Sequence, residues 1–177
     1  GCVPNSRYQA TNRGASLPMN REEFLPLIPK RPLSGEKENA YYRPASEAIK
    51  CPLIAPHTNC LRKVMAFDLD YPHSYFLPEE RGLPEPSFIS VSKGTGRAHA
   101  CYILDKPVSF FDNSRQGPIE FYRDVELGYR NRLTADPRYN GLMVKNPFHE
   151  RYDTHWQAVR HYRLDELRDS LDRDDIK

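Results

Sequence analysis

Residues 63–70 (KVMAFDLD) restrict the fold more than any other segment of the chain. Positions 65, 67 and 69 carry Met, Phe and Leu, and they alternate with Ala66 and the two acids Asp68 and Asp70. This two-residue period predicts a β-strand with one apolar face and a second face that becomes acidic at the end of the strand. The apolar residues before the acids provide the rigid base that a functional site needs.

Further strands and two helical segments are predicted after this strand. Residues 87–92 and 98–104 have strand patterns, and the glycine-containing loop between them favours an antiparallel hairpin. From residue 118 to residue 133, apolar residues recur at helical spacing, and Pro118 suits the first turn of a helix. Residues 141–145 indicate another strand, and leucines at 164, 167 and 171 form one helical stripe. The expected fold class is α/β (α+β), with an antiparallel-leaning sheet and flanking helices.

Prolines divide the chain into two parts. Sixteen of the 177 residues are proline and only 38% are hydrophobic, so a sizeable part of the chain should be irregular. Pro26 and Pro29 interrupt the short apolar run near the N-terminus, which disfavours a helix or a central strand there. We therefore expect a Pro-rich N-terminal arm over residues 1–40 and one folded domain over residues 41–177.

Composition excludes several classes of protein. The chain has no run of about 18 apolar residues and no charged-then-apolar leader, so we expect a soluble cytoplasmic protein with no membrane span and no membrane partner. Four cysteines are too few for a disulfide scaffold in a chain of this length. Because the net charge is only +2, any contact with a polyanion must come from local clusters of positive charge.

The aspartates at the end of the first strand form a candidate metal site. Asp68 and Asp70 are two residues apart, so on a strand they point the same way, with α-carbons roughly 6–7 Å apart. Both carboxylates can then converge on one hard divalent cation or on a pair of cations. The alternative interpretation is a strand end with two acids that face water.

The hairpin between the next two strands carries a candidate phosphate site. Glycines at 94 and 96 let backbone amides approach an anion, while Lys93 and Arg97 can offset phosphate charge. Ser92 precedes this loop and His99 follows it at the mouth of a strand. The loop is not a P-loop, because the G-K-[ST] order and the following helix are missing. The alternative is an ordinary hairpin with a solvated basic turn.

A lone aspartate later in the chain is a candidate third carboxylate. Asp136 precedes a glycine-led segment that ends in Lys145-Asn146-Pro147. It can join Asp68 and Asp70, or it can be a capping or turn residue, to which Asp-Pro is well suited.

These three features, in this order, resemble the catalytic domain of the archaeo-eukaryotic primase superfamily. In that superfamily an acid-x-acid strand comes first, a small-x-His strand second and a lone aspartate third; here these are Asp68 with Asp70, then His99, then Asp136. More narrowly, residues 102–108, 135–139 and 141–147 are similar to plasmid replicases of the colicin-plasmid type. The resemblance covers about residues 40–171 and implies a primase-like core with an RRM-like sheet.

The resemblance also implies an activity and a set of site residues. The protein would be a plasmid replication protein, a primase-polymerase that makes a primer on DNA by nucleotidyl transfer. Asp68, Asp70 and Asp136 would be catalytic and would hold Mg²⁺ or Mn²⁺. Asp105, Asp112 and Asp153 are alternatives for the third ligand. The residues expected to bind the nucleotide are His99, Ser92, Lys93, Arg97 and Lys145.

The partners implied by the resemblance are DNA, nucleotides and replication proteins. The template would be single-stranded or origin DNA, the substrates NTPs or dNTPs, and host replication machinery is a further expected partner. No module that reads DNA sequence is visible, so we expect origin recognition to lie beyond Lys177, in a longer protein of which residues 41–177 are the catalytic domain.

Three alternatives remain open at this stage. Cys51, His57 and Cys60 are possible zinc ligands, although they lack a CxxC half-site and a clear fourth ligand. Rolling-circle initiators use paired histidines around one apolar residue, and no such pattern occurs here. A non-catalytic DNA-binding replication module is the third alternative. Its strand-tracking face would consist of Arg151, Tyr152, His155, Trp156, Arg160, Tyr162 and Arg163, unless Trp156 is buried within a mixed surface.

Overall fold

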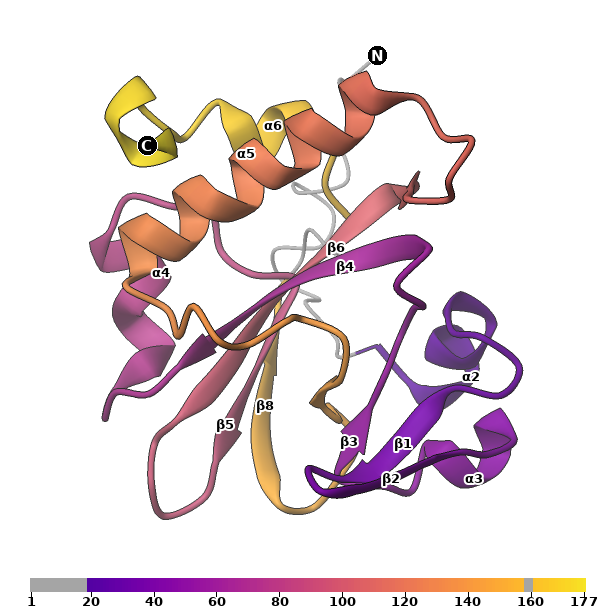
Figure 1. The fold of residues 1–177 in the computed structure, drawn as a ribbon. Helices are drawn as coiled ribbons and strands as arrows, with labels where there is room; N and C mark the ends of the chain where they lie inside the picture. Colours follow the sequence, from indigo (N-terminus) through magenta and orange to yellow (C-terminus); the bar gives the residue numbers. More distant parts are fainter. Residues whose placement is uncertain (1–18, 158–160) are drawn as a thin grey trace.

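The computed structural model describes residues 19–157 and 161–177, and its centre is a four-stranded antiparallel sheet. The strand order in this sheet is β4-β6-β5-β8 (Figure 1). The strands are β4 (Leu61–Leu69), β6 (Ala98–Ser109), β5 (Phe88–Ser92) and β8 (Tyr152–Trp156). The predicted strand at 63–70 and the predicted antiparallel hairpin of 87–92 with 98–104 are therefore present, and Asp70 lies just beyond the end of β4.

One face of the sheet packs against the long helix α5 (Gln116–Leu133) and the short helix α6 (Leu164–Arg168), which lie above the sheet in Figure 1. Phe67 of β4 stacks on Tyr129 of α5 with ring centroids 5.9 Å apart, and Tyr102 of β6 meets both rings edge-on. The helix predicted from apolar spacing is confirmed. Its buried positions are Ile119, Tyr122, Val125, Gly128, Tyr129 and Leu133.

A smaller sheet packs against the other face of the main sheet, and it has the order β2-β1-β3-β7. Its strands are β1 (Leu33–Glu36), β2 (Asn39–Tyr42), β3 (Leu53–Ile54) and β7 (Val144–Lys145). The short helices α2 (Arg21–Phe24), η1 (Leu25–Leu27) and α3 (Ala45–Ala48) lie beside it (Figure 1). Buried residues from both sheets, among them Ile54, Val64 and Phe88, form a second core with Phe24.

The expectation of an irregular segment before residue 41 is wrong for residues 21–40. This part forms α2, η1, β1 and most of β2, and Phe24 is only 1% exposed. The prolines do not break these elements because they lie at their ends: Pro26 occupies the first turn of η1, where an amide proton is not needed, and Pro32 directly precedes β1. Residues 1–18 of the predicted arm lie outside the described part of the chain.

Two other predicted elements are shorter than expected. Within 141–145 only Val144 and Lys145 form a strand, because Gly141 adopts a left-handed φ of 72° and the chain turns there. The helix predicted from the C-terminal leucines ends at Arg168, and the chain continues into η3 (Arg173–Ile176). Among the described residues, no helix combines the length and the apolar character needed to cross a bilayer.

Phe24 tests whether the N-terminal segment belongs to the folded core. Its ring packs edge-on against Phe148 with centroids 5.2 Å apart. We expect Phe24→Ala to lower the free energy of unfolding by about 3 kcal/mol, since a buried aromatic residue would leave a cavity. The matched control is Phe111→Ala, whose side chain is 49% exposed and should cost less than about 1 kcal/mol. Urea unfolding measures both, and equal small losses would show that residues 19–28 contribute nothing to stability.

Candidate active site

Three aspartates converge at the end of β4. Asp68, Asp70 and Asp136 each offer a carboxylate oxygen, and these oxygens all lie within 4.8 Å of one another. Asp68 and Asp136 are partly buried and Asp70 is exposed. Carboxylate oxygens are the hard ligands that Mg²⁺ and Mn²⁺ prefer, so this set of donors fits a divalent metal ion.

Backbone hydrogen bonds bring Asp136 to the pair on β4. The amide of Asp136 donates to the carbonyl of Asp68 at 3.0 Å, and Tyr71, directly after Asp70, donates its hydroxyl to the carbonyl of Thr134 at 2.9 Å. The Asp136 carboxylate also accepts from the amide of Arg138 at 2.9 Å, which is a turn-stabilising contact. The two interpretations of Asp136, turn residue and third carboxylate, are therefore compatible.

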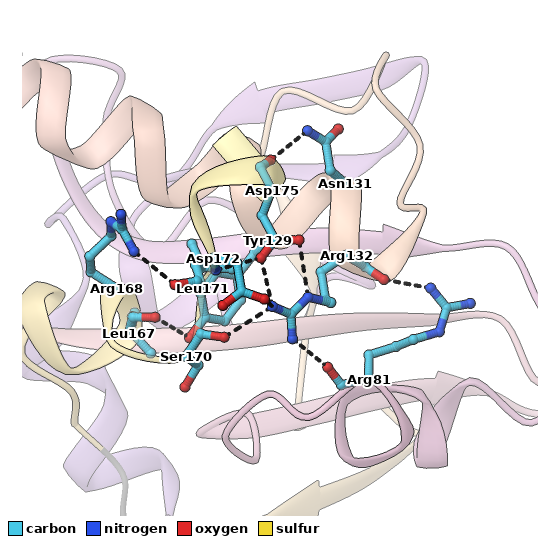
Figure 2. A network of polar contacts seen from close by, with 10 residues as sticks. All are labelled: Arg81, Tyr129, Asn131, Arg132, Leu167, Arg168, Ser170, Leu171, Asp172 and Asp175. Carbon is cyan, nitrogen blue, oxygen red and sulfur yellow. Dashed lines mark hydrogen bonds and ion pairs between the residues drawn. The ribbon is translucent and has the colours of Figure 1, made fainter. Parts of the chain in front are cut away.

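Arg132 anchors the end of α5 that leads into Asp136. Its guanidinium donates to both carboxylate oxygens of Asp175, at 3.2 and 2.6 Å, and to the carbonyl of Ser170 at 3.1 Å (Figure 2). It also donates to the carbonyl of Arg81 at 2.8 Å. These hydrogen bonds lower the pKa of Asp175. Through Arg132, the C-terminal turn η3 and the segment after α4 (Leu77–Glu80) thus hold the end of α5 in place. Arg132 lies four residues before Asp136, the third carboxylate.

His99 lies directly opposite Asp68 in the pairing of β4 with β6. Its Nδ1 accepts a hydrogen bond from the amide of Lys145 at 2.9 Å, so the neutral ring carries its proton on Nε2, which is 3.6 Å from Asp68 Oδ1. The ring of Tyr139 packs against the imidazole at 4.6 Å. Burial lowers the pKa of His99 well below 6.5, and the charge of Lys145 lowers it further.

The carboxylates and Lys145 balance each other in a partly buried setting. Burial raises the pKa of Asp68, and the negative charges of Asp70 and Asp136 raise it further, while Lys145 opposes them. Burial lowers the pKa of Lys145, whereas Asp68 and Asp70 favour its charged form. Lys145 and the Arg138 guanidinium, 3.3 Å from an Asp136 oxygen, offset part of the negative charge of the three carboxylates, and a bound cation would offset more of it.

The other predicted phosphate-binding residues lie farther along the β5–β6 hairpin. The amide of Ser92 donates to the carbonyl of Arg97 at 2.7 Å and closes the turn. Lys93 and Arg97 are exposed, and Lys93 lies 4.0 Å from Asp153 in a solvent-facing ion pair. The hairpin packs beside the segment that follows Asp70, because a β-carbon on Gly96 would come within 3.4 Å of Pro72 and His73. The hairpin turn therefore lies next to the segment that follows Asp70, whereas His99 and Lys145 lie closer to the carboxylates themselves.

A row of polar side chains extends from Asp68 across the sheet, and the sequence patterns do not reveal it. Strand register places Asp68 opposite His99, His99 opposite Ser90, and Ser90 opposite Thr154. The Thr154 hydroxyl donates to the Ser90 hydroxyl at 3.4 Å. The alternation within residues 87–92 hints at one polar face, but only the register shows that this face continues from the carboxylates.

The alternative third ligands lie elsewhere. Asp105 is near the far end of β6 from His99 and lines a separate surface cavity of about 670 Å³, and Asp112 lies in the turn beyond that end. Asp153 is paired with Val91, so its side chain emerges on the opposite face of the sheet from Ser90 and Thr154. Among the described residues, Asp136 is the acid that joins Asp68 and Asp70 in one group.

The structure argues against zinc at Cys51, His57 and Cys60. His57 is buried, its Nδ1 accepts from the amides of Lys63 and Val64 at 3.2 Å, and its Nε2 then donates to the carbonyl of Gly141 at 2.9 Å. Neither nitrogen has a lone pair left for a metal ion. His57 instead ties the start of β4 to the loop that follows Asp136.

The residues proposed for a strand-tracking face do not form one continuous stacking surface: of the named aromatic residues that the structure describes, only His155 is exposed, with its ring 4.4 Å from that of Tyr75. Tyr152 and Tyr162 are buried, and Trp156 is partly buried against Phe88, with ring centroids 4.8 Å apart. Arg160 lies outside the described residues. The alternative in which these aromatics belong to the packed protein fits this arrangement better than a strand-tracking face does.

The antiparallel sheet, with helices on one face and an acidic strand end beside a histidine, is the arrangement that the resemblance to the archaeo-eukaryotic primase superfamily implies. The structure is similar to the AEP domain of the cyanophage S-2L primase-polymerase (PrimPol), with a TM-score of 0.52 and 13% sequence identity over 80% of this chain and 87% of that chain. Residues 27–171 match the Replicase family, and the chain therefore belongs to that family. No curated protein sequence matches the chain. The resemblance inferred from the motifs and the α+β class are both confirmed.

His57 gives the protein a pH-dependent stability. Burial, followed by the charge of Arg62, lowers its pKa from 6.5 to about 3. Between pH 6.5 and about 3, His57 therefore binds a proton in the unfolded chain but not in the folded chain. The stability that the neutral His57 contributes above pH 6.5 is lost as the pH falls toward 3. The contribution approaches about 1.4 kcal/mol per pH unit. We expect His57→Gln to have a correspondingly shallower slope of unfolding free energy between pH 6 and 4, measured by urea unfolding.

Phe24→Ala is the control for that measurement, because it destabilises the protein without removing a titratable group. It should retain the wild-type slope at a lower stability. A slope in His57→Gln as steep as that of the wild type would contradict a neutral, buried His57.

Proposed function

We propose that the chain is the catalytic domain of a plasmid replication protein that synthesises a primer on a DNA template by metal-dependent nucleotidyl transfer. The observation that carries this proposal is the convergence of Asp68, Asp70 and Asp136 beside His99. It occurs in a chain of the Replicase family whose fold is similar to that of a primase-polymerase domain.

The three carboxylates would hold Mg²⁺ or Mn²⁺. A metal ion bound there would lower the pKa of a primer 3′-hydroxyl and would neutralise charge on the reacting phosphates. Asp68 and Asp136 are joined through the backbone, and Asp136 is anchored through α5, so the chain keeps these ligands in place without the metal.

The residues around the carboxylates would bind the triphosphate. His99 is held neutral with its Nε2 proton directed to the site, so it can donate a hydrogen bond to a phosphate oxygen. Lys145 supplies a partly buried positive charge beside it. Ser92, Lys93 and Arg97 at the hairpin turn would contact phosphates farther from the metal.

The proposed substrates are NTPs or dNTPs, and the proposed template is single-stranded or origin DNA. Nucleotidyl transfer needs the incoming α-phosphate and the 3′-hydroxyl to be aligned at the carboxylates, and base pairing with the template would select the nucleotide. Recognition of an origin and contact with host replication proteins are assigned to parts of the protein outside this site.

Asparagine substitutions test the carboxylates at constant side-chain volume. We expect Asp68→Asn and Asp70→Asn each to reduce primer synthesis at least about 100-fold, because a metal ion contributes several kcal/mol to the transition state. Asp112→Asn, in the turn beyond the far end of β6, should retain wild-type activity. The assay measures products on single-stranded DNA with NTPs or dNTPs and with Mg²⁺ or Mn²⁺.

Retention of the fold is checked in the presence of a chelator. Without metal, Asp68→Asn should be at least as stable as the wild type, because burial and neighbouring acids disfavour the ionised Asp68. Unchanged synthesis by both folded variants would overturn the metal assignment.

A further inference from the structure

The turn of the β1–β2 hairpin carries a lysine in the same small sheet as Lys145, within the segment that the prolines predict to be an arm. Lys37 is an exposed residue in the turn between β1 and β2. Register places Gly35 opposite Leu53, and Leu53 opposite Lys145. Strand β3 therefore lies between the hairpin and the strand that carries Lys145, and the hairpin turn extends past Leu53, the residue that pairs with both Gly35 and Lys145.

An ion pair fixes the hairpin next to the β5–β6 turn. One guanidinium nitrogen of Arg151 lies 2.9 and 3.2 Å from the two carboxylate oxygens of Glu36. The carbonyl of Arg151 accepts from the amide of Lys93 at 3.3 Å. Figure 1 shows the β1–β2 turn beside the connection that enters β8. Because both charged side chains are about half exposed, this pair adds little stability, and its effect is to orient the hairpin.

The charge of Lys37 acts on two of the three carboxylates. For Asp68, burial is the main influence on the pKa and raises it, and Lys37 joins Lys145 in opposing that rise. For Asp136, hydrogen bonds from Arg138 are the main cause of a lowered pKa, and Lys37 lowers it further. Within the described residues the Lys37 ammonium makes no hydrogen bond or ion pair, so it is available to a ligand.

We propose that Lys37 binds the β- or γ-phosphate of the incoming nucleoside triphosphate, with the Glu36–Arg151 pair as the positioning contact that holds its hairpin. This inference rests on the proposed function. A nucleoside triphosphate carries more negative charge than one divalent cation at the carboxylates would offset. Lys145 acts on the carboxylates from β7 and Lys37 from the hairpin turn, so these two lysines can offset the remaining charge. The flexible lysine stem and its three donors suit a mobile phosphate tail.

The test compares binding of dATP and dAMP in the presence of Mn²⁺, measured by equilibrium dialysis. Lys37→Gln should weaken dATP binding about tenfold, the loss of one charged hydrogen bond, and leave dAMP binding unchanged, because dAMP lacks the β- and γ-phosphates. Lys37→Arg should restore most of the dATP affinity. The matched control is Lys106→Gln, which removes the same charge near the far end of β6 and should bind both nucleotides as the wild type does.

Arg151→Gln provides a readout of the positioning contact. It should weaken dATP binding by a smaller factor than Lys37→Gln, and it should have little further effect when combined with Lys37→Gln, because both changes then act through the same lysine. Fully additive losses would show that Arg151 acts independently of Lys37.

The possible outcomes separate the two proposals. If the wild type binds dATP and Lys37→Gln binds it equally well, the role of Lys37 is overturned and the proposed function stands. If Lys37→Gln weakens dATP and dAMP equally, Lys37 is not a β- or γ-phosphate ligand. If the wild type binds neither dATP nor, in the same dialysis, ATP with Mn²⁺, both proposals fail.

Discussion

The register of β4 against β6 is the constraint on which the site depends. It places Asp68 opposite His99 on one face, while Phe67 and Leu69 enter the core under α5 on the other. A slip of one residue would turn Asp68 into that core and Phe67 and Leu69 out of it, at a large cost in buried charge. The same alternation that builds the core therefore determines the direction of the carboxylates.

The rest of the site is assembled from segments that are distant in sequence. The backbone amide of Asp136 donates a hydrogen bond to the carbonyl of Asp68. The backbone amide of Lys145, rather than its side chain, donates to the His99 ring and orients it. His57 ties the start of β4 to Gly141. Each of these contacts is a buried or partly buried hydrogen bond, and losing one would leave an unsatisfied polar group as well as a displaced residue.

Sequence patterns identified much of the core and of the site. Local patterns can be recognised in a single sequence. Here they are the two-residue period of residues 63–70, the helical spacing of residues 119–133 and the hairpin glycines. The N-terminal segment differs from its prediction, because Pro26 and Pro29, which disfavour a helix interior or a central strand, lie in the first turn of η1 and just after its end. Whether a proline breaks or begins an element depends on the hydrogen bonds around it, which composition does not show.

The sequence by itself determined the chemical inventory: an acid-x-acid strand end, a histidine on the next hairpin, a lone aspartate and a Replicase-family pattern. Tertiary structure alone decided which groups meet. It selected Asp136 rather than Asp105, Asp112 or Asp153, occupied both nitrogens of His57, and placed Lys37 at the turn of a hairpin in the same sheet as Lys145. The physical reason is that strand register and side-chain hydrogen bonds link residues far apart in the chain, and no local pattern records those links.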